Sequence, residues 1–283
     1  MGWLLEPGLL SALVLLSAFL YAVGLRRRLR LGSPRRRVEL LWRTVCFGAA
    51  LVLLDVALCP AFDRYAEKSL TMHMLQHVIV MTVVPPLVVL AAPWLTIWRA
   101  IPLDTRRSLA HGVLALPAWV RRGLRGLVGI VPAFLLINLS LAVWHVPWLY
   151  DLTLQNAVVH DVEHASFLVF GILFWFPVID SPPLRARLGK LQRALYVTAG
   201  MATGWVLALV LAFAASPLYD AYAELPRRLG GLSALGDQQL AAGVMLGLGS
   251  IPYTIALFAF LYRWLDEGRD VSRRSVLTTS SVR

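Results

Sequence analysis

Residues 71–94 read TMHMLQHVIVMTVVPPLVVLAAPW, a polar start followed by a long apolar run. About twenty residues in a helix, at a rise of about 1.5 Å each, cross the hydrocarbon core of a bilayer. A membrane span needs no histidine or glutamine, and polar side chains at membrane depth cost free energy unless something binds them. The stretch therefore predicts a transmembrane helix whose first turns, with His73 and His77, have a function of their own.

The composition extends this prediction to the whole chain. Hydrophobic residues make up 58% of the sequence and charged residues 15%, and the mean hydropathy is +0.68. We predict an all-α membrane protein that forms a single polytopic domain over residues 1–283. Its seven transmembrane helices are expected near residues 8–25, 40–59, 72–92, 128–145, 159–178, 194–214 and 238–262.

The basic residues predict an orientation and not a nucleic-acid surface. The net charge is +11, but the lysines and arginines gather between the apolar runs, which is typical of membrane topology. Twenty-two of them fall on one side of the expected membrane, and four on the other: Arg64, Lys68, Arg227 and Arg228. The positive-inside rule therefore places the N-terminus outside and the C-terminus in the cytoplasm.

With this topology, five of the six histidines lie at the outer ends of three helices. These five are His73, His77, His145, His160 and His164, whereas His111 falls on the cytoplasmic side. Other polar residues are expected at the same level, namely Asp55, Cys59, Asp237, Gln238 and Gln239.

The spacing of these residues favours a metal site. Residues four apart share one face of a helix, so His73 and His77 form one stripe and His160 and His164 a second. Imidazole suits zinc and copper, and facing helices of a bundle commonly build such centres. The five outer histidines are the predicted ligands. Softer or supporting groups are Met72, Met74, Met81, Asp55 and Cys59, and Asp151, Asp161 and Glu163 can orient imidazoles.

Three other uses of the same histidines stay open at this point. The run HDVEH (residues 160–164) fits the H-x-x-E-H zinc hydrolase pattern, with Glu163 as base and Glu224 as a possible third ligand. Haem can be held by histidines from two helices. A copper permease is the third alternative, although the polar residues become sparse below Met81.

The motifs HMLQH, WHVPWLYD with VVHDVEHASFLVFGILFWFPV, and DQQLAAGVM occur in this order along the chain. In this respect the sequence resembles the CtaG-type cytochrome c oxidase assembly factors, a seven-span bacterial membrane family. The matching positions are His73, His77, His145, His160, Asp161, Glu163, His164, Asp237, Gln238 and Gln239.

The resemblance implies a protein of the bacterial cytoplasmic membrane that assists maturation of a haem–copper oxidase. It implies copper, as Cu(I) or Cu(II), at a site facing the periplasm or exterior, with zinc or haem as alternatives. The expected partners are membrane lipid and an oxidase subunit or copper chaperone, without nucleic acid. The expected role is metal delivery and not catalysis.

Overall fold

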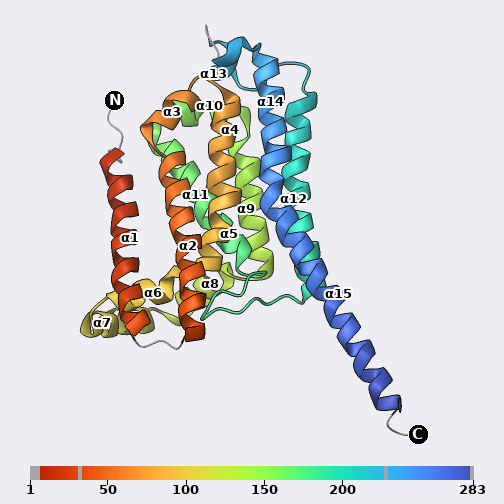
Figure 1. Cartoon of the computed structure of the whole chain (residues 1–283). Helices are drawn as coiled ribbons and strands as arrows, with labels where there is room; N and C mark the ends of the chain where they lie inside the picture. Colours follow the sequence, from red (N-terminus) through yellow and green to blue (C-terminus); the bar gives the residue numbers. More distant parts are fainter. Residues whose placement is uncertain (1–6, 31–33, 226–228, 281–283) are drawn as a thin grey trace.

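The computed structural model describes residues 7–30, 34–225 and 229–280. These residues form a bundle of helices without a β-strand, apart from one isolated bridge between Ser181 and Leu184 (Figure 1). The all-α prediction is therefore confirmed for the described part of the chain.

The long helical segments build the bundle. They are α1 (Pro7–Arg30), α2 (Pro34–Ala57), α4 (Leu70–Val78) continued by η1 (Ile79–Val83) and α5 (Val84–Ala91), α9 (Ile130–Trp144), α11 (Ala157–Trp175), α12 (Lys190–Phe213), and α14 (Ala234–Gly247) continued by η3 (Leu248–Ser250) and α15 (Ile251–Ser280).

Shorter helices cover the two ends of the bundle. One end, here called the histidine end, carries α3 (Pro60–Ala66), α10 (Pro147–Gln155) and α13 (Asp220–Ala223), with η2 (Leu229–Gly231) nearby (Figure 1). The opposite end, here called the basic end, carries α6 (Pro93–Ala100), α7 (Leu103–Ala115) and α8 (Ala118–Leu127). Helix α15 extends beyond the basic end (Figure 1).

Within the described ranges, five helices are long and apolar enough to cross a membrane: Arg37–Ala57, Leu70–Ala91, Ala157–Trp175, Lys190–Phe213 and Ala234–Glu267. A sixth span arises only if α8 and α9, which meet at 68°, count as one. Helix α1 is not among these spans. Its side chains are described from residue 12 onward, and this stretch ends in four arginines, at residues 26, 27, 28 and 30. The seven spans and the N-out orientation therefore stay predictions, and Arg227 and Arg228 lie outside the described residues.

The segment α4–η1–α5 is the centre of the bundle. Its apolar window is 61% buried, against 22–28% for the other four spans, so it faces protein where the others largely face lipid. It packs against α2, α11 and α14. Val80, Val84 and Val89 are fully buried, whereas Phe213 and Phe258 on outer helices are exposed.

The π-helical turn η1 follows from two prolines. Pro85 and Pro86 have no N–H group, so the usual helical bonds to Met81 and Thr82 cannot form and the turn widens. Helix α11 crosses here at very close range, because a Cβ atom on Gly171 would lie 2.7 Å from Cγ of Pro85 and 2.9 Å from the Met81 carbonyl oxygen. This glycine therefore sets how closely α11 approaches the central helix.

Candidate metal centre

The two histidine pairs meet at the histidine end of the bundle. His73 and His77 project from α4, His160 and His164 project from α11, and one ligand nitrogen from each lies within 4.8 Å of the others. The Nε2 atoms of His73 and His77 are 2.9 Å apart. The imidazoles of His73, His77 and His164 are buried, and that of His160 is partly exposed. These four residues are called the four-histidine cluster below.

Each pair occupies the first turns of its helix after a capping side chain. Ser69 caps α4 by accepting a hydrogen bond from the Met72 N–H, and Asn156 caps α11 by accepting from the N–H groups of Val158 and Val159. His73 and His160 each follow their cap by four residues in the sequence. The two helices thus present their pairs at the same level.

Asp237, a predicted site residue, belongs to α14 and does not lie among the imidazoles. Its carboxylate contacts the start of α4. Its carboxylate accepts hydrogen bonds from the Ser69 hydroxyl (2.9 Å), the Leu70 N–H (2.8 Å), and the Thr71 N–H (3.1 Å) and hydroxyl (2.6 Å). A negative charge is favourable there because it meets the positive end of the helix dipole. Asp237 therefore positions the helix that carries His73 and His77.

The neighbouring glutamines also make structural contacts. The Gln238 amide donates to the Leu211 carbonyl (2.9 Å) and accepts from the Leu218 N–H (2.8 Å), which ties α14 to α12 and the loop after it. Gln239 is exposed and donates one bond of 3.4 Å to the Ala212 carbonyl. Neither belongs to the four-histidine cluster.

A tyrosine that sequence reasoning missed orients His73. The Tyr222 hydroxyl donates to the Ala66 carbonyl (2.7 Å), so its oxygen accepts from Nδ1–H of His73, which lies 2.7 Å away. This tautomer leaves the Nε2 lone pair of His73 free to face His77. Burial raises the pKa of Tyr222 well above its ordinary value, so the phenol stays protonated.

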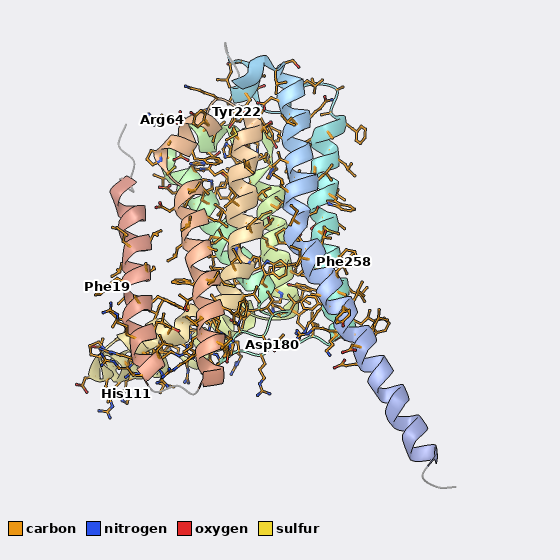
Figure 2. The ribbon with its side chains drawn as sticks, viewed as in Figure 1. Phe19, Arg64, His111, Asp180, Tyr222 and Phe258 are labelled. Carbon is orange, nitrogen blue, oxygen red and sulfur yellow. The ribbon has the colours of Figure 1, made fainter. Side chains whose placement is uncertain are left out.

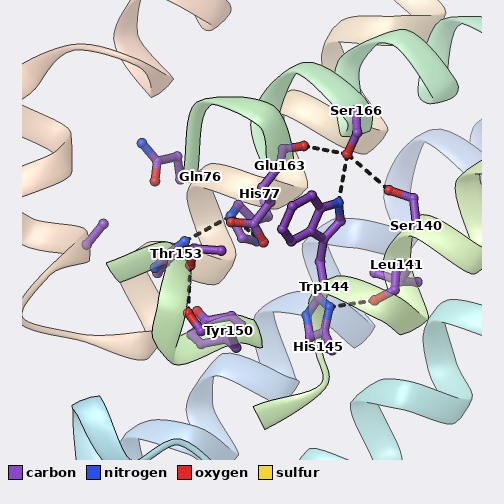
Figure 3. Close-up of polar contacts among 12 residues, drawn as sticks. Gln76, His77, Ser140, Leu141, Trp144, His145, Tyr150, Thr153, Glu163 and Ser166 are labelled. Atoms are coloured by element: carbon purple, nitrogen blue, oxygen red, sulfur yellow. Dashed lines mark hydrogen bonds and ion pairs between the residues drawn. The ribbon is translucent and has the colours of Figure 1, made fainter. Parts of the chain in front are cut away.

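His145 lies beside the cluster. Its ring centroid is 6.5 Å from that of His77, and its Nδ1–H donates to the Leu141 carbonyl at 2.8 Å, which leaves Nε2 as the acceptor nitrogen (Figure 3). Ligating histidines usually make this kind of bond through the other ring nitrogen. His145 is thus an outlying fifth imidazole and does not belong to the four-histidine cluster.

Several buried polar atoms around the cluster have no hydrogen-bond partner among the described residues. They are Nδ1 of His77, Nε2 of His145, His160 and His164, and both carboxylate oxygens of Glu163. Glu163 is fully buried, and its Oε1 lies 3.7 Å from Nε2 of His77 (Figure 3). Unpaired buried polar atoms are rare and each costs free energy, so this concentration indicates a site built to receive a ligand.

Gln76 is the glutamine of the polar start of the central span, and it is not among the predicted site residues. It lies between His73 and His77 in the sequence, and its amide donates to the Asp63 carboxylate (2.6 Å) and the Ala57 carbonyl (2.7 Å). These bonds attach α4 to α3 and to the end of α2. Burial raises the pKa of Asp63 to about 6, and the bond from Gln76 acts against this increase.

The other predicted residues fall into two groups. The methionines pack: Met74 is buried against aromatic residues, Met81 packs against the main core, and Met72 is partly buried. The polar ones lie nearer the cluster: Asp55, Cys59 and Asp161 line a cavity together with His160 and His164, and Asp151 accepts from the Ala221 N–H at 3.2 Å.

Two further residues named from the sequence, one histidine and one glutamate, lie away from the cluster. His111 is exposed on α7 at the basic end (Figure 2). Glu224, the third ligand of the hydrolase alternative, is exposed at the end of α13 and is not part of the four-histidine cluster.

Comparison with known proteins agrees with the motifs. The chain is 25% identical over 273 residues to an uncharacterized protein of Mycobacterium bovis and equally to one of Mycobacterium tuberculosis. The matches cover 94% of this chain but only 40% of each relative, so the chain spans less than half the length of these proteins. No solved structure matches it significantly. The family model of the cytochrome c oxidase caa3 assembly factor (Caa3_CtaG) matches residues 19–267, and the chain belongs to this family.

Proposed function

We propose that this assembly factor binds a copper ion at the four-histidine cluster and assists its insertion into a haem–copper oxidase. The family supplies the assembly role. The copper site, its position at the outer face of a bacterial cytoplasmic membrane, and transfer to an oxidase subunit or copper chaperone are our proposals. These proposals concern the whole chain in its membrane.

The observation that carries the proposal is the convergence of four imidazole nitrogens within 4.8 Å. A tetrahedral ion about 2.0 Å from each nitrogen holds the nitrogens about 3.3 Å apart, so small rotations of the rings would complete the coordination. The Tyr222 contact already directs the Nε2 lone pair of His73 into the cluster. The donor set fits Cu(I), Cu(II) and zinc, and the oxidase role favours copper.

The alternatives have less support. A hydrolytic zinc site keeps one position open for water, whereas four histidines fill a tetrahedral shell. Haem would need space for a porphyrin between its two axial imidazoles, and the Nε2 atoms of His73 and His77 are only 2.9 Å apart. A permease would need ligands deeper in the bundle, where the central helix buries Val80 and Val84.

The test is the copper content of the full chain purified in detergent. Replacing both ligands of one helix, His73→Ala with His77→Ala, should lower bound copper about tenfold or more. His111→Ala is the matched control and should leave the copper content unchanged, because His111 lies on α7 at the other end of the bundle. Equal copper in the wild type and the double variant would contradict the assignment.

Maturation of the oxidase in cells gives the second measurement. The double variant should reach the membrane at normal levels but fail to support oxidase activity, and added copper should restore activity in part. The variant Glu163→Gln separates delivery from hydrolysis, because an amide cannot act as a general base. Retained oxidase maturation in Glu163→Gln is expected. Its complete loss, at unchanged copper content, would favour the hydrolase alternative.

A further inference from the structure

A cavity of about 580 Å³ lies beside the four-histidine cluster. Its walls come from α1, α2, α3, η1 and α11, so it lies between α1 and the neighbouring helices of the bundle (Figure 1). His160 and His164 form part of its wall. His164 is only 7% exposed and its Nε2 has no hydrogen-bond partner in the described part of the chain. The cavity therefore reaches an unsatisfied imidazole of the cluster.

The wall of this cavity combines an apolar part with a polar part that is mainly acidic. Four carboxylates line it, from Asp55, Asp63, Glu67 and Asp161, and among the described lining residues Arg64 is the one lysine or arginine. Asp55 and Glu67 are exposed, and Asp63 and Asp161 are partly buried. A cleft lined by one sign of charge raises the local concentration of ions of the opposite sign. This cavity thus attracts cations next to two imidazoles.

The remaining sides of the cluster are closed. His73 and His77 are 1% and 3% exposed, and Tyr222 and Tyr150 pack against His73. His160 is the partly exposed member of the four. An ion that reaches the cluster from the histidine end therefore meets His160 and His164 first.

We propose that this acidic cavity is the route by which the metal cation enters and leaves the four-histidine cluster. The carboxylates attract the hydrated cation and guide it to His160 and His164. Carboxylate oxygen is a hard ligand that copper holds less firmly than imidazole, so the ion passes on to the nitrogens. This inference rests on the proposed copper site and adds the path to it.

The rate of copper uptake tests the path separately from the site. Aqueous Cu²⁺ is mixed with the full chain in detergent, and quenching of tryptophan fluorescence is followed by stopped flow. The double variant Asp55→Asn with Glu67→Gln should take up copper about three- to tenfold more slowly at low salt. The difference should shrink as salt is raised, because salt screens exposed charges. Copper bound at equilibrium should stay equal to that of the wild type.

Two variants test whether the effect depends on the sign of the charge and on its position at the cavity. Arg64→Gln removes the positive charge at the cavity and should accelerate uptake. Asp104→Asn removes an exposed carboxylate from α7 at the basic end and should leave the rate unchanged. His73→Ala with His77→Ala gives the signal of copper bound elsewhere on the surface, which is subtracted.

A blocking experiment supplies an independent measurement. Cys59 lines the cavity, so in a Cys46→Ser background a bulky neutral maleimide on Cys59 should slow uptake strongly. Unchanged uptake after complete labelling, or equal rates for the wild type and the carboxylate variant at low salt, overturns the route while leaving the copper site in place. A wild type that binds no copper overturns both proposals.

Discussion

Asp237 tests how the four-histidine cluster is held in place, because its carboxylate does not belong to the cluster and yet binds the start of α4, the helix that carries His73 and His77. In Asp237→Ala the N–H groups of Leu70 and Thr71 and the hydroxyls of Ser69 and Thr71 lose this acceptor. Hydrogen bonds to a charged group contribute about 1.5–3 kcal/mol each, and a buried N–H left unpaired costs about 1–3 kcal/mol. The favourable interaction with the helix dipole is lost as well.

We expect Asp237→Ala to lower the free energy of unfolding by about 4 kcal/mol, since some of these donors find other partners. For a chain of this size that corresponds to a fall in Tm of about 8–16 °C. Thermal unfolding of the purified chain in detergent measures it. Asp237→Asn keeps the shape and one acceptor oxygen without the charge, and should fall between the wild type and the alanine variant.

The matched control is Gln239→Ala on the same helix. Its side chain is exposed and makes one bond of 3.4 Å, so the change in unfolding free energy should stay within about 0.5 kcal/mol. Copper content should fall in Asp237→Ala, because the helix of His73 and His77 loses its anchor, and stay normal in the control. If Asp237→Ala melts within 2 °C of Gln239→Ala, on the order of the measurement error, the capping argument is refuted.

Three further changes test other parts of the site. Tyr222→Phe removes the oxygen that accepts from His73 and should weaken copper affinity about 10- to 100-fold, measured by competition with a chelator. Its fold should persist, since the ring still fills its place. The folded pKa of Asp63 is raised to about 6, so ionisation destabilises the fold as pH rises from the unfolded value, near 3.8, through 6. Asp63→Asn should therefore raise Tm at pH 7.5 by the equivalent of about 1 kcal/mol, discounted for partial exposure, and this gain should disappear near pH 4. Gly171→Ala pushes α11 away from the central helix. It should lower the free energy of unfolding by about 1–3 kcal/mol, and with it both Tm and the copper content. Gly48→Ala, which meets nothing within 4 Å, is its control.

The convergence of the histidines could be predicted because helix periodicity is local. Spacing by four residues places His73 beside His77 and His160 beside His164 on any α-helix. The apolar runs after each pair then fix the depth at which both pairs lie. These two facts bring four of the five predicted histidines into one cluster, and they leave His145, at the end of its helix, beside it.

The residues that orient the histidines and their helix could not be found in this way. Tyr222 and His73 are separated by 149 positions, and Asp237 and Ser69 by 168. A contact between such distant segments has no period in the sequence, so composition and spacing do not reveal it. The polarity of Asp237 predicts only that it lies at the end of a span, and whether it faces the imidazoles or the helix backbone depends on how α14 packs against α4.

The number of spans could not be read from the sequence for a similar reason, namely that it depends on a bend in the folded chain. The expected helix at 128–145 is a 15-residue helix, α9, that needs the bent α8 to reach a membrane-spanning length. The bend occurs at Gly129, whose N–H bonds back to the Gly126 carbonyl at 2.7 Å, and where a Cβ atom would approach that oxygen to 2.8 Å. A hydropathy window averages over such a break and cannot detect it.

The histidines lie near helix N-termini, whose partial positive charge disfavours a cation, and nearby acidic residues offset this charge. The N-termini of α4 and α11 each carry a partial positive charge of about half a unit, which opposes a bound cation. Asp237 offsets the first of these at the start of α4. Asp161, which lines the cavity, places a carboxylate near the second. Asp237 and Asp161 therefore need not touch an ion at the cluster to favour it, because each offsets the positive end of a helix that carries two of the histidines.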